Sequence, residues 1–140
     1  MKIKITLDSG AYRPERAHDT DAGLDLRTRE GVIIWPMSSS VIDTGIHMAI
    51  PEGYYGKLEG KSGLNINHGI VSLGGVIDSG YTGSIKAKLY NLSTEPYTFH
   101  TGEKVVQLII QPCVTDTELI LVDDLEETER GDKGFGSTGR

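Results

Sequence analysis

Cysteine is nearly absent from this sequence and proline is scarce: the 140 residues include one Cys and five Pro. Because Cys113 has no second cysteine to pair with, no disulfide can form within the chain, which fits a reducing compartment. Long apolar runs are missing too. No segment approaches the ~20 apolar residues of a membrane-spanning helix, and residues 1–7 lack the apolar stretch of a signal peptide. We therefore expect a soluble, cytoplasmic protein without membrane contact.

The sequence also lacks clusters of positively charged residues. The formal net charge is −6, and Lys and Arg are not gathered into a patch, so no direct nucleic-acid partner is expected. A small anionic ligand remains compatible with this charge, because a single site can be locally positive. A zinc site is not expected, since the histidines lack the spacing of paired metal ligands: His18, His47, His68 and His100.

Glycine, in contrast, is abundant: there are 18, and ten of them lie between Gly45 and Gly83. With so few prolines, this pattern indicates tight turns between short ordered segments. Alternating or β-branched apolar segments recur along the chain, with a kink or bulge expected at Gly45. The predicted strands lie at residues 1–7, 32–35, 41–50, 85–90, 105–110 and 119–122. They predict an all-β sandwich, jelly roll or barrel in one compact domain.

One short helix is expected, and its start is a candidate anion site. Ser62 can cap the helix and Gly69 can end it, with apolar contacts from Leu64 and Ile66. Free N–H groups at a helix start bind anions, so a phosphate site is possible at Lys61, Ser62 and Gly63. The spacing matches neither a Walker A loop nor a nucleophile elbow. An ordinary capped turn is the alternative.

The C-terminal segment, residues 130–140, has Phe135 as its main apolar side chain and cannot build a core of its own. We expect a mobile tail that follows a β domain at residues 1–129. The tail also contains groups that bind phosphate, namely glycines, two hydroxyls and a guanidinium, in Gly136, Ser137, Thr138 and Arg130. Phe135 offers a flat face on which a base can stack. By itself, the segment is also typical of a disordered terminus.

Asp78 ends an apolar run in the segment GVIDSGYTG, residues 75–83, just before a predicted strand. Such a position can hold a carboxylate half buried beside a water molecule, where it can act as a general base. The alternative is a turn aspartate that hydrogen-bonds its own backbone.

Two further polar residues interrupt apolar surroundings. Asp25 stands between leucines in DAGLDLR, residues 21–27, where it could hold a metal-bound water or pair with Arg27. Gln107 interrupts the apolar strand in GEKVVQLIIQ, residues 102–111. Because a buried unpaired amide costs about 1–3 kcal/mol, Gln107 needs a partner, either backbone or ligand.

Together, five segments resemble the five motifs of the trimeric dUTPase family, in the family's order: DAGLDLR, GKSGL, GVIDSGYTG, GEKVVQLIIQ and RGDKGFGSTG. The resemblance runs from residue 21 to the C-terminus. It implies a jelly-roll or distorted β-barrel homotrimer, with each active site assembled from three chains. It also implies hydrolysis of dUTP to dUMP and pyrophosphate, which limits uracil incorporation into DNA and supplies dUMP for dTMP synthesis.

The resemblance also implies a role for each matched residue. Asp78 would activate the water that attacks the α-phosphorus, and Tyr81 would pack on the deoxyribose and exclude a 2′-hydroxyl. Uracil would be read by the hairpin backbone around Leu73, Gly75 and Ile77. Cytosine reverses the donor and acceptor of uracil, so it would leave backbone groups unpaired.

The remaining matched residues would hold the triphosphate. Gln107, the second catalytic residue, would hydrogen-bond near the α-phosphate, and Asp25 would hold Mg²⁺ through water. Other phosphate oxygens would be bound by Lys61, Ser62 and Gly63. In the tail, Phe135 would cover uracil, and the γ end would be gripped by Arg130, Ser137 and Thr138, next to Gly136.

Two positions depart from the family's usual pattern. Lys61 stands where Arg is more common, so a point charge replaces a bidentate fork. Gly80 stands where a second Asp is frequent, which leaves Asp78 as the acidic candidate of that motif. Two alternatives on the same fold stay open: an enzyme related to dCTP deaminase, and a nucleotide-sensing regulatory protein with an unknown protein partner.

Overall fold

The structure is a computed structural model that describes residues 1–134 of the chain. Within this range the chain forms short strands and one short helix. The elements are β1 (Lys4–Leu7), β2 (Leu24–Arg27), β3 (Val32–Ile34), β4 (Ser38–Asp43), β5 (Ile46–Ala49), β6 (Tyr54–Gly60), α1 (Ser62–His68), β7 (Ile70–Ser72), β8 (Val76–Ile77), β9 (Lys86–Asn91), β10 (Tyr97–Phe99) and β11 (Lys104–Pro112). The predicted all-β class with one short helix is confirmed for these residues.

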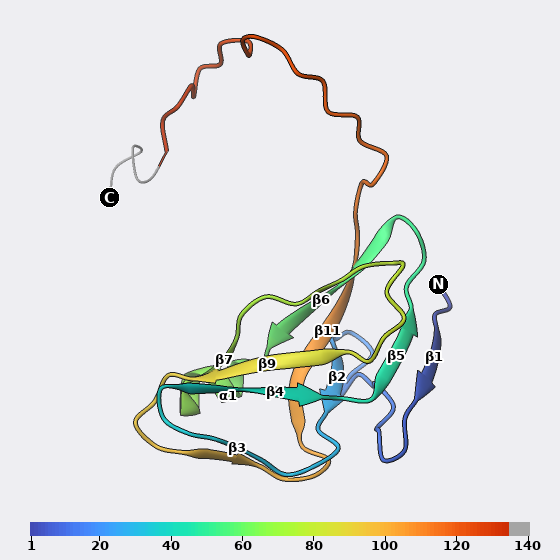
Figure 1. The fold of residues 1–140 in the computed structure, drawn as a ribbon, viewed down its shortest axis with the longest axis vertical. Coiled ribbons are helices and arrows are strands. Elements are labelled where there is room, and N and C mark those ends of the chain that lie inside the picture. The colour runs from blue at the N-terminus through green and yellow to red at the C-terminus, as the bar shows by residue number, and fades with distance from the viewer. Residues whose placement is uncertain (135–140) are drawn as a thin grey trace.

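Strand β11 lies inside the largest sheet, whose order is β2-β11-β6-β8. It pairs antiparallel with β2 on one side and with β6 on the other, from Val106↔Gly60 to Pro112↔Tyr54. A second sheet, of order β4-β9-β7, lies in front of it in Figure 1. The pairs β1-β5 and β3-β10 complete the body.

The core lies between the sheets and consists mainly of aliphatic side chains. Strand β9 shows the alternation that produces it, since Ala87 and Leu89 are buried while Lys86 and Lys88 are exposed. The largest fully buried apolar side chains are Phe99, Leu26, Ile34, Ile42, Ile46, Ile70, Ile85, Leu89, Leu108, Val105 and Val106. β-Branched residues dominate because they pack well on pleated faces.

Two of the predicted strands differ in the structure. Residues 41–50 contribute to two strands, β4 and β5, because Gly45 adopts φ 66° and turns the chain between them. Residues 119–122 form no strand within the described chain, and Leu119 and Leu121 are 92% and 99% exposed. An apolar run becomes a strand only where another strand satisfies its backbone groups, and none in the described part of this chain does so.

Helix α1 differs from its prediction in two details. Lys61, not Ser62, is the N-cap, and no side chain caps the helix. Ile66 is exposed, although Leu64 packs against the core as predicted. Gly69 ends the helix in the left-handed conformation, which confirms the expected terminator. No helix in the described residues is long and apolar enough to cross a membrane.

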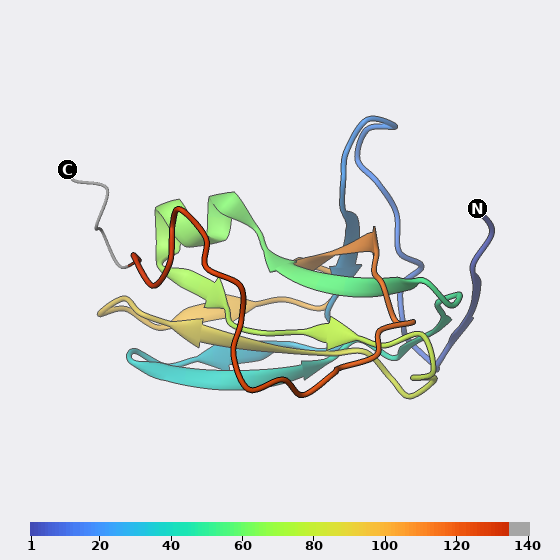
Figure 2. The same cartoon turned by 90° about the horizontal axis from the view of Figure 1, so that it is seen from above.

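After β11 the chain leaves the body as an extended segment, which we call the C-terminal arm (residues 113–134). The arm contains no helix or strand and runs away from the sheets in Figure 1, whereas in the view from above it crosses in front of them (Figure 2). Its exposed apolar side chains are Val114, Leu119, Ile120, Leu121, Val122 and Leu125. Such a series of exposed apolar side chains is typical of a surface that packs on another molecule.

The packing around Gly56 of β6 is directly testable. A Cβ atom at this position would lie 2.8 Å from Leu108 Cδ1 and 2.9 Å from Ile50 Cδ1. We expect Gly56→Ala to lower the free energy of unfolding by about 1–3 kcal/mol through overpacking, as measured by urea denaturation. Gly63→Ala is the matched control, because its Cβ would meet nothing within 4 Å. Equal losses in both variants would contradict this description of the core.

Candidate active site

Three neighbouring strands bring polar side chains together on one surface of the main sheet. Gln107 of β11 lies opposite Asp25 of β2 and opposite Glu59 of β6. Paired residues of antiparallel strands project to the same face, so these side chains gather beside Lys61, which follows β6. They adjoin a cleft of about 290 Å³, which we call the phosphate cleft, lined by Glu59, Gly60, Lys61, Ser62, Asn65, Val71, Ser72 and Gln107.

Asp25 is buried between two lysines. Its Oδ2 accepts a hydrogen bond from Lys104 Nζ at 2.6 Å, and its Oδ1 pairs with Lys61. Burial alone would raise the pKa of the Asp25 carboxyl, but the hydrogen bonds and charges of Lys104 and Lys61 lower it below the ordinary 3.8. Asp25 is therefore ionised. The alternative pairing with Arg27 is wrong, since Arg27 pairs with Glu15 at 2.9 Å.

Gln107 has a backbone partner, as its position in an apolar strand requires. Its Nε2 donates a hydrogen bond to the Gly60 carbonyl at 3.2 Å. A Cβ atom at Gly23 would lie 2.4 Å from Gln107 Oε1, so the glycine of DAGLDLR provides the space for this amide. The second Nε2 hydrogen remains available to a molecule in the phosphate cleft.

The start of α1 forms one wall of the phosphate cleft. Lys61 is the N-cap, and Ser62 and Gly63 are the first helical residues, whose N–H groups have no partner within the helix. The Lys61 side chain is 28% exposed, so its ammonium group can be reached from solvent. This corner offers a positive charge, a hydroxyl and backbone donors, a combination that suits phosphate oxygens.

A glycine hairpin forms a second cleft of about 150 Å³ that shares Glu59 and Ser72 with the first. Gly74 and Gly75 adopt φ values of 82° and 117°, which side chains disfavour. The Gly75 carbonyl accepts a hydrogen bond from Leu58 N at 2.8 Å, and a Cβ at Gly75 would lie 2.6 Å from Leu58 Cβ. The hairpin backbone therefore borders the cleft only because glycine occupies these positions.

The two other predicted uracil-reading positions flank this glycine pair. Leu73 is exposed, whereas Ile77 is buried and belongs to the core. Ile77 can therefore present only backbone groups to a ligand, which agrees with recognition through the main chain.

Asp78 lies away from the phosphate cleft. It follows β8, whose Ile77 pairs with Gly56 of β6, whereas Lys61 follows the opposite end of β6. Asp78 therefore lies near the level of Tyr55 in β6. A strand rises about 3.3 Å per residue, so the stretch of β6 between Tyr55 and Lys61 separates the two side chains by roughly 20 Å. The Asp78 side chain is exposed, so the expectation that it is half buried is wrong for the single chain.

Tyr81 is held within the loop that follows Asp78. Its backbone N–H donates to the Asp78 carbonyl at 3.1 Å, and its hydroxyl donates to the Ser84 carbonyl at 2.9 Å. A Cβ atom at Gly83 would lie 2.5 Å from the Tyr81 hydroxyl oxygen. The glycine thus lets the ring fold back over its own loop, where it is fixed in orientation.

The residues predicted in the tail are described only in part. Arg130 lies in a turn of the C-terminal arm, where its Nε donates to the Lys133 carbonyl at 3.1 Å. Outside the described residues lie Phe135, Gly136, Ser137 and Thr138.

Lys104 belongs to the site and was not predicted. In a regular strand its side chain would face away from Gln107, three residues further on. The pairing of β11 with β2 shifts register between Lys104 and Val106, and this irregularity turns Lys104 toward Asp25. The burial of two adjacent valines, Val105 and Val106, reflects this register shift, because regular alternation would bury only one of them.

Comparison with known proteins identifies the family. A family model described as dUTPase matches residues 11–139. This chain belongs to the dUTPase family. The deoxyuridine 5'-triphosphate nucleotidohydrolase of Finegoldia magna is 41% identical and that of Saccharomyces cerevisiae is 38% identical. The matches cover 99% and 98% of this chain, and 99% and 94% of the relatives. Both relatives are hydrolases by name, which does not favour the deaminase alternative.

Solved dUTPase structures have the same fold. A point mutant of the Staphylococcus bacteriophage 80alpha dUTPase, with dUpNHpp, superimposes with a TM-score of 0.93 at 32% identity, over 99% of both chains. A point mutant of the dUTPase from phage phi11 of S. aureus, which coordinates a structural Mg(II) ion, has a TM-score of 0.84 at 30% identity, over 91% of this chain and 100% of its own. The predicted dUTPase-type jelly roll is thereby confirmed.

The capacity of this dUTPase-family site for a metal ion is limited. The described residues contain no group of three or more His, Cys, Asp or Glu that could hold an ion. Both carboxylate oxygens of Asp25 face ammonium groups. A carboxylate has about four lone-pair sites, so Asp25 can still accept a hydrogen bond from a metal-bound water. The donors fit Mg²⁺ that is held mainly by substrate phosphates and water.

Replacement of Asp25 by Asn tests the Lys61–Asp25–Lys104 cluster. The amide removes the negative charge and places an NH₂ donor against an ammonium group, so we expect a loss of about 1–3 kcal/mol in the free energy of unfolding near neutral pH. Because the folded pKa lies below 3.8, this stabilisation is present above about pH 4 and is lost as the pH falls through the folded pKa.

Urea denaturation of wild type and Asp25→Asn at about pH 7 and about pH 3 measures this difference, which should shrink in acid. Asp19→Asn, at an exposed position, is the control and should match wild type at both pH values. A loss in Asp25→Asn that is the same at both pH values would show that the ionised pair is not its cause.

Proposed function

We propose that the protein hydrolyses dUTP to dUMP and pyrophosphate through attack of water on the α-phosphorus. The observation that carries this proposal is the phosphate cleft, where Lys61 and the start of α1 offer an ammonium group, a hydroxyl and backbone donors. This cleft suits a phosphate chain, and the glycine hairpin of a neighbouring subunit suits a flat base that backbone groups can recognise. Membership of the dUTPase family supports the same activity. Such an enzyme limits uracil incorporation into DNA and supplies dUMP for dTMP synthesis.

In this proposal the phosphate chain is bound by Lys61, Ser62, Gly63 and Gln107. Lys61 can turn from Asp25 to a phosphate because Lys104 holds the same carboxylate. The buried charge of Asp25 then never lacks a cation, a situation that would be strongly destabilising. Mg²⁺ would be held by phosphate oxygens and, through water, by Asp25, and would neutralise charge on the phosphates.

The base and the sugar are recognised by the hairpin and the loop that follows it. Uracil hydrogen-bonds the backbone around Leu73, Gly75 and Ile77, and cytosine would leave the same groups unpaired. Tyr81, fixed by its hydrogen bond to the Ser84 carbonyl, packs on the deoxyribose and leaves no space for a 2′-hydroxyl.

Asp78 is the proposed general base. It takes the proton from the attacking water, and the rest of the catalysis consists of positioning and charge neutralisation. A base must lie within hydrogen-bond reach of the proton it removes, and roughly 20 Å of β6 separates Asp78 from Lys61 in the same chain. Asp78 of one subunit therefore serves the phosphate cleft of another.

The C-terminal arm supports the same assembly. Its exposed apolar side chains need a partner surface, and a homotrimer in which each arm packs on a neighbour provides one. The tail, residues 130–140, would then close over a neighbour's pocket after the β domain, residues 1–129. The uracil would be covered by Phe135, with the phosphates held by Arg130, Gly136, Ser137 and Thr138.

Replacement of Asp78 by Asn separates catalysis from binding. The amide cannot accept the proton of the attacking water, so we expect the turnover number for dUTP to fall by at least about 100-fold. The affinity for dUpNHpp, measured by calorimetry, should change little. The control Glu52→Gln makes the same chemical change at an exposed turn and should keep wild-type turnover. Normal pyrophosphate release by Asp78→Asn would exclude Asp78 as the base.

Mixed trimers test whether the site is shared. Asp78→Asn and Lys61→Gln subunits, unfolded and refolded together in equal amounts, should regain about a quarter of wild-type activity. A working site then takes its Asp78 from one variant and its Lys61 from the other. Each variant refolded alone is the control. Activity of the mixture that stays at the mean of the two variants would place both residues in one subunit.

A further inference from the structure

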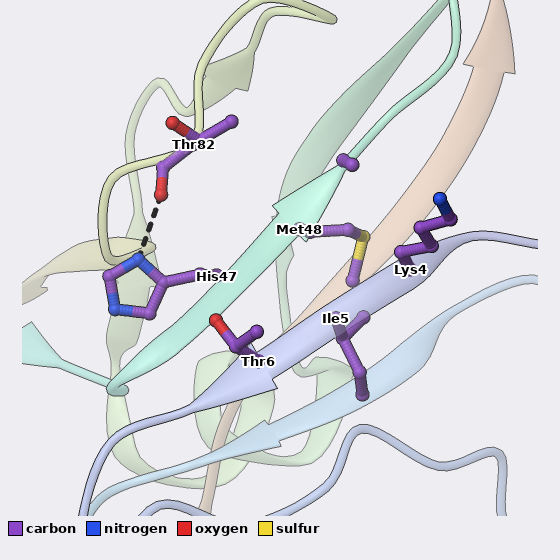
Figure 3. Close-up of a pocket in the computed structure, with 7 residues that line it drawn as sticks. Lys4, Ile5, Thr6, His47, Met48 and Thr82 are labelled. Atoms are coloured by element: carbon purple, nitrogen blue, oxygen red, sulfur yellow. Dashed lines mark hydrogen bonds between the residues drawn. The ribbon is translucent and has the colours of Figure 1, made fainter.

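His47 of β5 connects the end of β1 to the loop that contains Asp78 and Tyr81. Its Nδ1 lies 2.8 Å from the Thr82 carbonyl oxygen, and its Nε2 lies 3.2 Å from Asp8 Oδ1. Figure 3 shows the imidazole ring turned toward Thr82, with a dashed line for this hydrogen bond. The ring borders a pocket of about 170 Å³, so protons from solvent can reach it.

Both partners of the ring are hydrogen-bond acceptors. A carbonyl oxygen and an ionised carboxylate have no proton to donate. A neutral imidazole has one N–H, so it satisfies one partner and turns a lone pair toward the other. An imidazolium donates from both nitrogens. The arrangement at His47 therefore fits the protonated ring.

The charges that face His47 favour the same form. Asp8 and Asp43 share one guanidinium, with Arg29 Nη1 3.4 Å from Asp8 Oδ2 and Arg29 Nη2 3.4 Å from Asp43 Oδ2. The charges of Asp8 and Asp43 both act on the ring and favour its protonated form. The hydrogen bond to the Thr82 carbonyl, followed by the hydrogen bond and charge of Asp8, raises the pKa of His47 above 6.5 against an opposing effect of burial.

Two lysines complete the charges around this group. Lys86 of β9 acts on Asp43. Lys4 of β1 borders the same pocket, but its side chain points away from His47 in Figure 3. Neither lysine has a hydrogen bond to the imidazole ring in the described residues.

His47 hydrogen-bonds Thr82, which is the residue next to Tyr81 in the loop. Ser84 bonds Asp43 through its hydroxyl, and Ile85 N donates to the Ile46 carbonyl at 2.8 Å. These two hydrogen bonds, from Ser84 and from Ile85, hold the end of the loop. Of these contacts with β4 and β5, only the hydrogen bond of His47 reaches the residue that directly follows Tyr81.

We propose that protonated His47 positions the loop of Asp78 and Tyr81 for the reaction, by donating one hydrogen bond to Thr82 while Asp8 holds the ring in place. His47 acts through Thr82, so it is a positioning residue and not a catalytic one. The inference rests on the proposed function, because Asp78 and Tyr81 have these roles only if the protein hydrolyses dUTP.

The proposal predicts a direction for the pH dependence. Because the folded pKa of His47 lies above 6.5, the protonated form is complete at lower pH and is lost as the pH rises through the folded pKa. Deprotonation removes one of the two hydrogen bonds of the ring, so either Thr82 loses its donor or the ring loses its attachment to Asp8. The KM for dUTP should therefore rise about threefold to tenfold on the alkaline side, the effect expected for one hydrogen bond.

Steady-state hydrolysis of dUTP between about pH 6 and about pH 9 tests this in wild type and variants. His47→Gln keeps an N–H donor for Thr82 at every pH, so its KM should lack the alkaline rise. His47→Leu removes the donor, so its KM should be raised at every pH, with a smaller change in kcat. The ratio of wild type to His47→Gln at each pH cancels the pH effects that both proteins share, such as the ionisation of dUTP.

A further variant tests the effect of the Asp8 charge, and a second variant is its control. Asp8→Asn removes the carboxylate that favours the imidazolium, so the alkaline rise in KM should move to lower pH. His100→Gln, at an exposed position outside this cluster, is the matched control and should follow wild type. Parallel KM profiles in wild type, His47→Gln and His47→Leu would overturn the proposal.

NMR provides a readout that needs no turnover. The ring nitrogens of His47 should titrate above pH 6.5, and amide hydrogen exchange at residues 79–83 should be faster in His47→Leu. An unshifted titration together with unchanged exchange would also overturn the proposal. Failure of the proposed function looks different, because wild type itself would then release no pyrophosphate from dUTP while the titration and exchange results stayed as expected.

Discussion

The phosphate cleft depends on one strand that pairs with two others. Because β11 lies between β2 and β6, Gln107 is adjacent to Asp25 and to Glu59 at once. The irregularity before Val106 then turns Lys104 to the same face and gives Asp25 its second cation. A carboxylate with two cations can release one of them without becoming an unpaired buried charge. One shifted residue in a strand thereby frees Lys61 for an anionic ligand.

Local sequence features predicted local structure well. Gly69 ends the helix because it tolerates the left-handed conformation, and the half-buried amide of Gln107 has a backbone partner, as its place in an apolar strand predicts. Features that depend on which strands pair, and in which register, could not be predicted from the sequence. Lys104 faces Asp25 only through a register shift that no residue type specifies. Residues 119–122 have the composition of a strand, but strand formation also needs a neighbour, which the described part of the single chain does not provide.

The candidate site divides into parts that are held in different ways. The phosphate cleft is built on strands of the main sheet and on the start of α1, and ion pairs with the buried carboxylate of Asp25 hold its lysines. The loop of Asp78 and Tyr81 is held instead by hydrogen bonds to β5. These parts lie at opposite ends of β6, so a single chain does not bring them together. Family membership names the reaction, and the structure shows which contacts control each part.

The exposed apolar side chains of the C-terminal arm set an order of events during biogenesis. The body buries its core with residues from β1 to β11 alone, so the proposed trimer would form from chains that have already folded. Between folding and the proposed association, the arm would be open to proteases and to non-specific aggregation. The length of that interval falls as the concentration of chains rises. Synthesis in bursts, which crowds new chains together, would shorten it, whereas slow synthesis would leave the arm unprotected for longer.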